Sequence, residues 1–273
     1  TVQTLDAVRE QVARHPNALQ QILTTADVET ALREGKAGFL SGIEGGRGPI
    51  AGKLDNYQKF YRKGLRLAGI SHGEGGPEAG YSQGSKSLNY PVKPQLRASR
   101  ERTDVGLTPF GIDALRVMNE LGILTDLAHI NDKAFMDVIE KSTRIPIVSH
   151  TNVYALCQQG RCVTDDQIKV LAAKGGVLGM TFVRSFIANN PEQATLDRYI
   201  DHICYIADMV GIEHVCVGTD FDGGVPKPLL ADVSRLVELT RGLMIRGFSD
   251  AEIKSIWSGN LLRVMKQVID QRA

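Results

Sequence analysis

Several apolar runs of this chain end in a residue that can bind a metal or move a proton. The residues at these ends are Glu44, His72, His129, His150 and Asp220. Imidazole and carboxylate groups are ordinary ligands of Zn²⁺, and a carboxylate is also a general acid or base. If the fold brings these side chains together, they predict a catalytic site built around a divalent metal, with zinc the expected ion.

Each of these residues also has a structural alternative. His129 or His150 alone could be a core histidine with its hydrogen bonds satisfied, and Asp220 could cap the turn that follows its strand. Because both histidines end consecutive strands, the ligand interpretation is favoured for the pair. Glu44 could be a solvated loop acid, but it stands between an apolar strand and two glycines, which let backbone approach a ligand closely. His72 could be a surface residue beside the loop that follows it.

Other polar residues receive lesser roles. Arg161 is either a surface residue or a clamp for a substrate carboxylate, which suits its planar guanidinium. Asp126 could orient a neighbouring histidine, and Asp222 is expected to shape the turn after Asp220. The remaining histidines are interpreted as structural; they are His15, His202 and His214.

The elements that must position these side chains are short strands alternating with helices. Continuous apolar runs bounded by Gly, Pro, Asp or Ser are typical of parallel strands buried on both faces. The predicted strands are 37–43, 65–71, 123–127, 145–149, 176–181 and 215–219. In a parallel α/β barrel the carboxyl ends of all strands meet at one mouth, where active sites lie.

Helical patterns separate the runs and support an α/β fold with a parallel sheet. Thr108 and Pro109 begin one helix, and Ser249 with Glu252 forms a capping box for the last. The predicted helices are 54–63, 108–121, 131–141, 164–174, 195–210 and 232–246, followed by the C-terminal one.

Six strand–helix units are two fewer than a closed (β/α)₈ barrel requires. The chain is therefore predicted to be a single TIM-type (β/α)₈ barrel domain over 1–273 that lacks its first one or two strands. A helical lead-in covers 1–36 and a long Gly-rich loop covers 72–106.

Composition limits the possible partners. The 273 residues carry 32 Lys and Arg against 31 Asp and Glu, a formal net charge of +1. This balance argues against a nucleic-acid-binding protein, which usually has a basic excess. No run reaches the roughly 18 apolar residues that span a bilayer, and no signal peptide is recognised, so no transmembrane segment is expected. The compartment stays open, because a cytoplasmic protein and an exported one with its signal removed would look alike.

Five segments occur in an order that resembles the membrane (renal) dipeptidase family of zinc peptidases. They are GIEGG, TDLAH, SHTN, GTDFDGG and GNLLRV, and together they extend over nearly the whole chain. The resemblance implies a (β/α)₈ barrel with a two-zinc site that hydrolyses dipeptides, including ones with a D-residue at the C-terminal position. A homodimer is expected by the same analogy.

The resemblance also implies roles for individual residues. Glu44 would bridge both metals, and His129 with His150 would bind the second zinc. Asp220 would contact the bridging water and move its proton, and it would also touch substrate. His72 would stabilise the tetrahedral intermediate and Arg161 would hold substrate. The segment that starts at Arg161 reads RCVTD here, so the Asn and Pro of the family pattern are replaced.

One departure concerns the first zinc. The family carries an H-x-D pair on its first strand, and none of the six histidines here is followed by that pattern. The simplest expectation is that the natural protein has an N-terminal segment outside these 273 residues. The alternatives are a variant with one metal or none that binds small peptides without efficient catalysis, or a metal-dependent amidohydrolase for a non-peptide amide or lactone.

Overall fold

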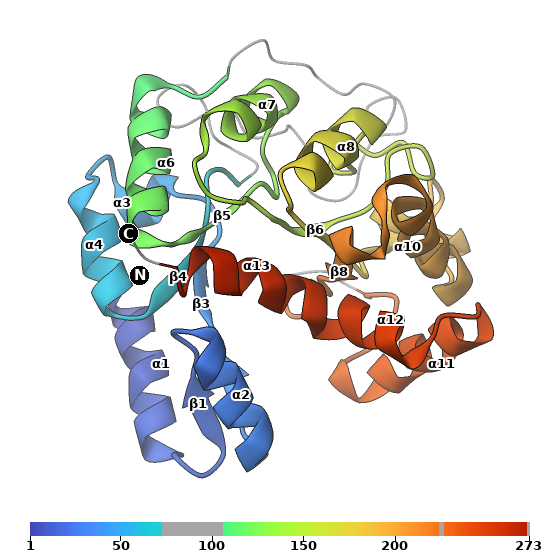
Figure 1. The fold of residues 1–273 in the computed structure, drawn as a ribbon, viewed down its shortest axis with the longest axis horizontal. Coiled ribbons are helices and arrows are strands. Elements are labelled where there is room, and N and C mark those ends of the chain that lie inside the picture. The colour runs from blue at the N-terminus through green and yellow to red at the C-terminus, as the bar shows by residue number, and fades with distance from the viewer. Residues whose placement is uncertain (73–105, 224–226, 272–273) are drawn as a thin grey trace. The chain divides into compact units, whose positions relative to one another are not determined.

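A computed structural model describes residues 1–72, 106–223 and 227–271 of the chain. Within this part the chain forms two compact units. The first comprises residues 1–72, 106–146 and 262–271, and the second comprises 147–223 and 227–261. Each unit is an arrangement of parallel strands and helices (Figure 1).

The first unit contains two parallel sheets, with strand orders β1–β2 and β3–β4–β5. Helix α1 packs beside β1, and α2 contacts both strands of the smaller sheet (Figure 1). The elements are α1 (Val2–Arg14), β1 (Leu19–Gln21), α2 (Thr25–Glu34), β2 (Ala37–Phe39), β3 (Ser41–Ile43), α3 (Arg47–Ile50), α4 (Asp55–Arg62), β4 (Leu65–Gly69), α6 (Pro109–Leu121), β5 (Leu124–Asp126) and α7 (Asp132–Lys141).

Local sequence explains where the long helices of this unit begin. The Thr108 hydroxyl accepts a hydrogen bond from the Gly111 amide at the start of α6, and Pro109 occupies the first helical position. The Asn131 side chain caps α7 in the same way by accepting from the Ala134 amide. Both helices turn apolar faces inward, so burial of side chains such as Met118 adds to the stability that the caps supply.

The predicted strand 37–43 is wrong as a single buried strand. Residues 37–39 form β2 and pair with β1, whereas residues 41–43 form β3 and pair with β4. The chain changes hydrogen-bonding partner at Leu40, and all three residues of β2 are exposed. The lead-in 1–36 contains the expected helices α1 and α2, but β1 between them was not predicted.

A buried arginine in β4 joins the smaller sheet to the larger one within the first unit. Arg66 Nε donates to the Leu23 carbonyl at 2.9 Å, and Nη1 donates to the carbonyls of Tyr61 and Leu65. Burial lowers the pKa of the Arg66 guanidinium from its ordinary value. The carbonyl oxygens replace the water that this charge loses on folding, which is why a cation is tolerated in an apolar strand.

The second unit is built on the parallel sheet β6–β7–β8. Helix α10 contacts β7 and β8, and α11 lies beside α10 (Figure 1). The elements are β6 (Val148–Thr151), α8 (Asp165–Ala173), β7 (Leu178–Met180), α9 (Arg184–Ile187), the 3₁₀ turn η2 (Pro191–Gln193), α10 (Leu196–Val210), the 3₁₀ turn η3 (Ile212–His214), β8 (Val215–Val217), the 3₁₀ turn η4 (Val233–Arg235), α11 (Leu236–Ile245), α12 (Asp250–Lys254) and the π-helical turn η5 (Ser255–Gly259). The last helix, α13 (Asn260–Val268), begins in this unit, and its residues from 262 onward belong to the first.

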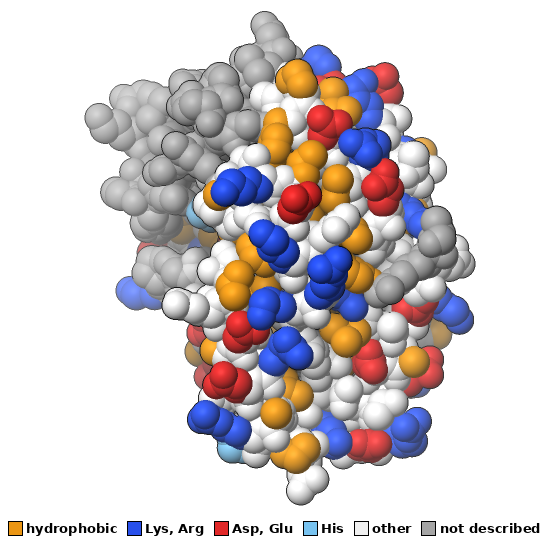
Figure 2. Space-filling model, turned by 90° about the vertical axis from the view of Figure 1, so that its left-hand side faces the viewer, with side chains coloured by type: hydrophobic (Ala, Val, Ile, Leu, Met, Phe, Trp, Pro, Cys, Tyr) orange, Lys and Arg blue, Asp and Glu red, His pale blue; other side chains and the backbone are white. Residues whose placement is uncertain are grey.

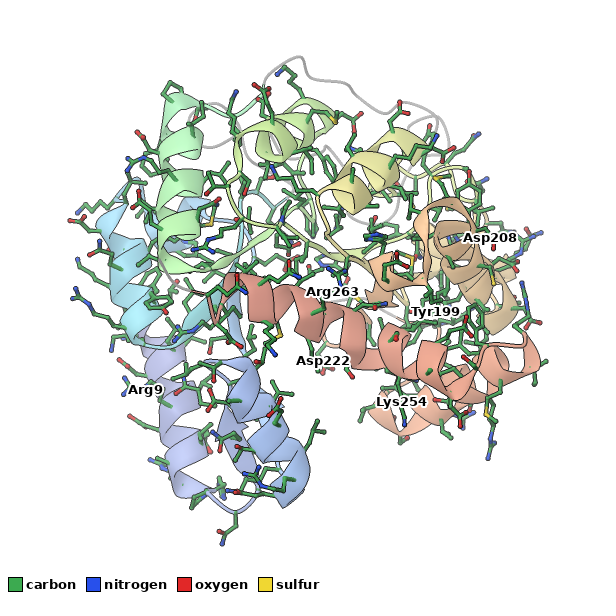
Figure 3. All side chains as sticks on the ribbon, in the orientation of Figure 1. Arg9, Tyr199, Asp208, Asp222, Lys254 and Arg263 are labelled. Atoms are coloured by element: carbon green, nitrogen blue, oxygen red, sulfur yellow. The ribbon has the colours of Figure 1, made fainter. Side chains whose placement is uncertain are left out.

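Aromatic packing holds α10 against the sheet of the second unit. Tyr199, labelled in Figure 3, is completely buried, and its hydroxyl donates to the Met180 carbonyl in β7 at 2.9 Å. Its ring lies 4.7 Å from the ring of Phe182, which lies 5.5 Å from that of Phe221. These tilted aromatic contacts connect the helix to the segment that follows β8.

The remaining helix predictions are confirmed within a few residues, and the capping box of Ser249 and Glu252 forms at α12. Over the described residues the strands form three parallel sheets, and their pairing does not close into a ring of eight. The predicted loop 72–106 lies almost entirely outside the described residues. The single-domain assignment over 1–273 stays a prediction.

Two surface features bear on possible partners. In the described part of the chain, no helix combines the length and the apolar character needed to cross a bilayer. On the face drawn in Figure 2, Lys and Arg side chains are interspersed with Asp and Glu. The described residues of that face therefore present a surface of mixed sign, in keeping with the near-zero net charge.

Candidate metal and substrate site

In the first unit, one carboxylate and two imidazoles come together at the carboxyl ends of three neighbouring strands. Glu44 follows β3, His72 follows β4 and His129 follows β5. The Glu44 Oε1 atom lies 2.7 Å from His129 Nε2, and its Oε2 lies 3.8 Å from His72 Nε2. The two imidazole rings are 4.3 Å apart between centroids. The structure thus joins three of the predicted site residues.

Close packing requires a glycine directly after Glu44. Gly45 has a φ of +76°, and a Cβ added there would lie 2.8 Å from the Cβ of His72. Only glycine avoids both the backbone strain and the clash. The Gly46 amide donates to the Ile70 carbonyl at 3.3 Å, which fixes the turn after β3 against the end of β4. Glu44 and His72 are consequently held side by side.

His129 adopts a backbone conformation that is uncommon for a residue with a side chain. Its φ is +65°, in the left-handed region. The Asp126 carboxylate accepts from the Ala128 amide at 3.0 Å, and the Ser71 hydroxyl donates to the His129 carbonyl at 3.2 Å. Such strain persists where neighbouring contacts determine the conformation, and it is concentrated at functional sites. Asp126 therefore shapes the turn that presents His129.

Exposure differs within this cluster. The side chains of Glu44 and His72 are 48% and 47% exposed, whereas that of His129 is 12% exposed. A ligand could therefore reach Glu44 and His72 from solvent, while His129 forms the more enclosed side of the cluster. Partly exposed carboxylate and imidazole donors around one point suit a catalytic metal.

In the second unit, His150 is presented by an irregularity at the end of β6. The pairing register between β6 and β7 shifts between Val148 and Thr151. The Ser149 hydroxyl lies 2.8 Å from His150 Nδ1, so this contact orients the ring and directs Nε2 to any further ligand. Sequence reasoning placed His150 at a strand end, but it did not foresee this serine contact.

Arg161 lies in the loop that follows β6. Its side chain is buried, and the guanidinium carbon lies 5.7 Å from the centre of the Phe186 ring. The Thr151 hydroxyl donates to the Arg161 carbonyl at 2.9 Å. An isolated parallel bridge between Val153 and Val163 closes the loop. Arg161 is thereby attached to the strand that carries His150, and it is not the surface residue of the alternative interpretation.

Asp220 follows β8 and, like His129, has a left-handed backbone, with a φ of +60°. The Phe182 amide donates to the Thr219 carbonyl at 3.2 Å, and the Thr219 hydroxyl accepts from the Phe221 amide at 3.3 Å. A Cβ on Gly223 would overlap the Asp220 carboxylate. Asp222 also has a positive φ, which agrees with its predicted role in the turn.

The histidines interpreted as structural have structural contacts. His15 ends α1, and its carbonyl accepts backbone hydrogen bonds. His214 Nδ1 pairs with the Gly176 carbonyl at 2.8 Å before β8 begins. His202 is buried in α10 and contacts backbone atoms through both ring nitrogens. The sequence pattern gave no signal for these backbone partners.

Parallel α/β sheets with carboxylate and imidazole side chains at their carboxyl ends are typical of metal-dependent hydrolases. A family model described as membrane dipeptidase, peptidase family M19, matches residues 1–273. The chain therefore belongs to the membrane dipeptidase family, as the five sequence segments indicated.

Individual relatives agree with this assignment. The chain is 26% identical over 275 residues to "Dipeptidase tcpJ" of Claviceps purpurea (strain 20.1), covering 100% of this chain and 61% of that protein. It is 30% identical over 272 residues to the "Uncharacterized protein in pqqA 5'region" of Klebsiella pneumoniae, covering 98% of this chain and 96% of that protein.

A solved structure of a metallo peptidase from Rhodobacter sphaeroides, liganded with a phosphinate mimic of the dipeptide L-Ala-D-Ala, matches with a TM-score of 0.82. The identity is 25%, over 95% of this chain and 71% of that one. The chain spans 61% of the length of the first curated relative. The fold of this chain is also that of solved dipeptidase structures.

Proposed function

We propose that this chain hydrolyses dipeptides with a divalent metal, zinc, bound by Glu44, His129 and His150. The observation that carries the proposal is the Glu44 carboxylate placed between the imidazoles of His72 and His129 in a member of the membrane dipeptidase family. Peptide hydrolysis at neutral pH needs an activated water and a polarised carbonyl, and a metal held by these residues would supply both effects.

The donor set fits zinc. One carboxylate oxygen and two imidazole nitrogens are the ligand types of catalytic zinc sites, which keep a further position open for water or substrate. Glu44 Oε1 and His129 Nε2 already lie within hydrogen-bonding distance of each other, so a small separation would admit an ion. We propose His150 Nε2 as the third ligand, because Ser149 engages Nδ1.

The complete two-zinc centre of the family would need the H-x-D ligands, which this sequence does not contain. We therefore propose one zinc per chain for these 273 residues and two where those ligands are supplied. A metal bound at Glu44 would polarise the substrate carbonyl and lower the pKa of the attacking water towards neutrality.

The chain's own residues then have separate tasks. Asp220 accepts the proton of the attacking water and passes it to the leaving amine. His72 donates a hydrogen bond to the oxygen that gains negative charge in the tetrahedral intermediate. Arg161 binds the free carboxylate of the dipeptide through its planar guanidinium, and its burial strengthens that charge-assisted contact.

We also propose that dipeptides with a D-residue at the C-terminal position are substrates. The related Rhodobacter sphaeroides peptidase, 25% identical to this chain, is liganded with a mimic of L-Ala-D-Ala. A guanidinium that holds only the terminal carboxylate does not by itself select the configuration of the neighbouring carbon. Comparing L-Ala-D-Ala with L-Ala-L-Ala tests this part of the proposal.

The first experiment is metal analysis of this 273-residue chain after exhaustive dialysis, together with a panel of dipeptides, a simple amide and a lactone. One zinc per chain with dipeptide cleavage supports the proposal. Metal without cleavage of any dipeptide would favour a peptide-binding protein, and cleavage of the amide or lactone alone would favour an amidohydrolase.

The substitution Glu44→Gln is the direct test of the metal site. It should remove bound metal and activity together, because a neutral amide is a much weaker ligand than a carboxylate. Glu140→Gln, an exposed carboxylate on α7 that is 73% accessible, serves as the control and should leave both unchanged. Full metal content with full activity in Glu44→Gln would reject Glu44 as a ligand.

A further inference from the structure

His202 is a buried histidine that the proposed chemistry does not use. It lies in α10 with 1% of its surface exposed. Its Nδ1 atom lies 3.0 Å from the Val153 amide nitrogen, and its Nε2 atom lies 3.0 Å from the Ile187 carbonyl oxygen in α9. The imidazole thus bridges the loop after β6 and helix α9, both within the second unit.

These partners determine the protonation state of the ring. A backbone amide can only donate, so Nδ1 must accept; a carbonyl can only accept, so Nε2 must carry the proton. The ring is therefore neutral, with its hydrogen on Nε2. Burial has the largest effect and lowers the pKa of His202 from its ordinary value; the bond to the Ile187 carbonyl and the nearby Asp201 raise this pKa by less, and Arg198 lowers it.

The Val153 amide, which donates to His202, belongs to the segment that carries the proposed site residues His150 and Arg161. Val153 is three residues beyond His150 and forms the bridge with Val163 that closes the loop containing Arg161. A shift of the Val153 amide would therefore displace His150, the proposed metal ligand, and also Arg161, the proposed substrate-binding residue.

A second side chain supports the same segment. Asn152 is completely buried; its amide donates to the Thr181 carbonyl at 3.1 Å and its side-chain oxygen accepts from the Thr181 amide at 3.3 Å. This pair of bonds ties the end of β6 to the end of β7. Among the contacts described for Val153, only its hydrogen bond to His202 connects its backbone to helices α9 and α10.

We infer that His202 is a positioning residue, whose neutral imidazole fixes the Val153 backbone and thereby places His150 and Arg161 for metal and substrate binding. The inference rests on the proposed function for the roles of those two residues. The hydrogen-bond bridge itself does not depend on any activity, so the two can be tested separately.

Two variants separate the halves of the bridge. In His202→Asn the side-chain oxygen can take the place of Nδ1 and keep the bond from Val153, while the bond to Ile187 is lost. In His202→Gln the side-chain amide can take the place of Nε2 and keep the bond to Ile187, while the bond from Val153 is lost. His214→Asn is the control, since His214 contacts Gly176 and not this loop.

The readouts are Zn²⁺ affinity measured by competition with a chelating dye, hydrogen exchange of the Val153 amide, and the separate values of KM and kcat. Loss of a hydrogen bond made directly to a metal ligand typically changes metal affinity about 10- to 100-fold. Because His202 acts through the Val153 backbone, His202→Gln should weaken zinc binding by the lower of these factors, about 10-fold, expose the Val153 amide to exchange and raise KM. His202→Asn and His214→Asn should stay within about threefold of the unchanged protein.

Equal zinc affinity and equal Val153 exchange in the Gln and Asn variants would overturn the inference, because a merely structural histidine would lower stability in both without distinguishing them. If neither variant folds, rapid exchange of the Val153 amide in the unchanged protein would overturn it instead. Failure to cleave any dipeptide would reject the proposed function, while the zinc and exchange measurements would still decide the role of His202.

Discussion

The close packing around the end of β6 predicts that Gly179→Ala will disturb the proposed metal site from a distance. A Cβ added at Gly179 in β7 would lie 2.8 Å from the Ser149 carbonyl carbon and closer still to its oxygen. A Cβ added at Gly218, the residue after β8, would also clash with the Ser149 carbonyl oxygen, and it would lie 3.0 Å from the Gly179 Cα. The irregular end of β6 therefore rests on two residues without side chains.

The size of the effect follows from that geometry. Packed carbon atoms keep about 3.5–4.0 Å between them, so Ser149 would have to retreat by roughly 1 Å. Overpacking of this kind typically costs about 1–3 kcal/mol of folding free energy. Ser149 precedes His150, and a displacement of about 1 Å in catalytic geometry can lower the rate about 100-fold.

The assay combines denaturant unfolding, zinc affinity and dipeptide hydrolysis. Gly48→Ala is the matched control, because an added Cβ there has no atom within 4 Å and the residue is exposed. The control should change stability by no more than about 1 kcal/mol, the usual effect of a Gly-to-Ala change in a helix, and should leave zinc affinity and rate unchanged. If Gly179→Ala matched the control in stability, zinc affinity and rate, the Ser149 backbone would not be constrained by the glycines and the reasoning would be refuted.

Three further predictions concern single groups. Asp220→Asn should lower kcat about 100-fold or more while zinc stays bound, since a proton acceptor is lost; loss of zinc instead would make Asp220 a ligand. Tyr199→Phe should cost only about 1 kcal/mol in denaturant unfolding, because the Met180 carbonyl keeps its bond from the Gly218 amide; a change above about 3 kcal/mol would contradict this. Because burial lowers the pKa of His202 in the folded chain, the unfolded chain binds more protons below about pH 6.5. The stability from His202 should be complete above that pH and decline as the pH falls through it, so the urea midpoint of His202→Asn should vary less over that range.

The sequence by itself determined which residues end the strands and where most helices begin. Glu44, His72 and His129 were predicted to converge because parallel strands present their carboxyl ends at one edge, and the contacts of Glu44 with both histidines confirm it. Thr108 and Ser249 were predicted to cap helices, and both do. These features depend on residue type and local spacing, which are visible in a one-dimensional pattern.

Hydrogen-bonding partners of strands were not visible in that pattern. The apolar run 37–43 looks continuous, but β2 pairs with β1 and β3 pairs with β4. Strand β1, with the polar sequence Leu19–Gln21, has no alternating or apolar signal of its own and exists through its pairing. The choice of partner is a long-range property, so the sequence pattern left it open.

Only the tertiary structure decided how the site residues are aimed. His129 and Asp220 adopt left-handed backbone conformations that their residue types tolerate but do not require. Contacts with distant residues, such as Ser71 with the His129 carbonyl and Phe182 with the Thr219 carbonyl, make those conformations stable. The residue types suffice to name the chemistry, whereas orientation comes from packing between segments far apart in the chain, because only the folded chain brings their backbone donors and acceptors within reach.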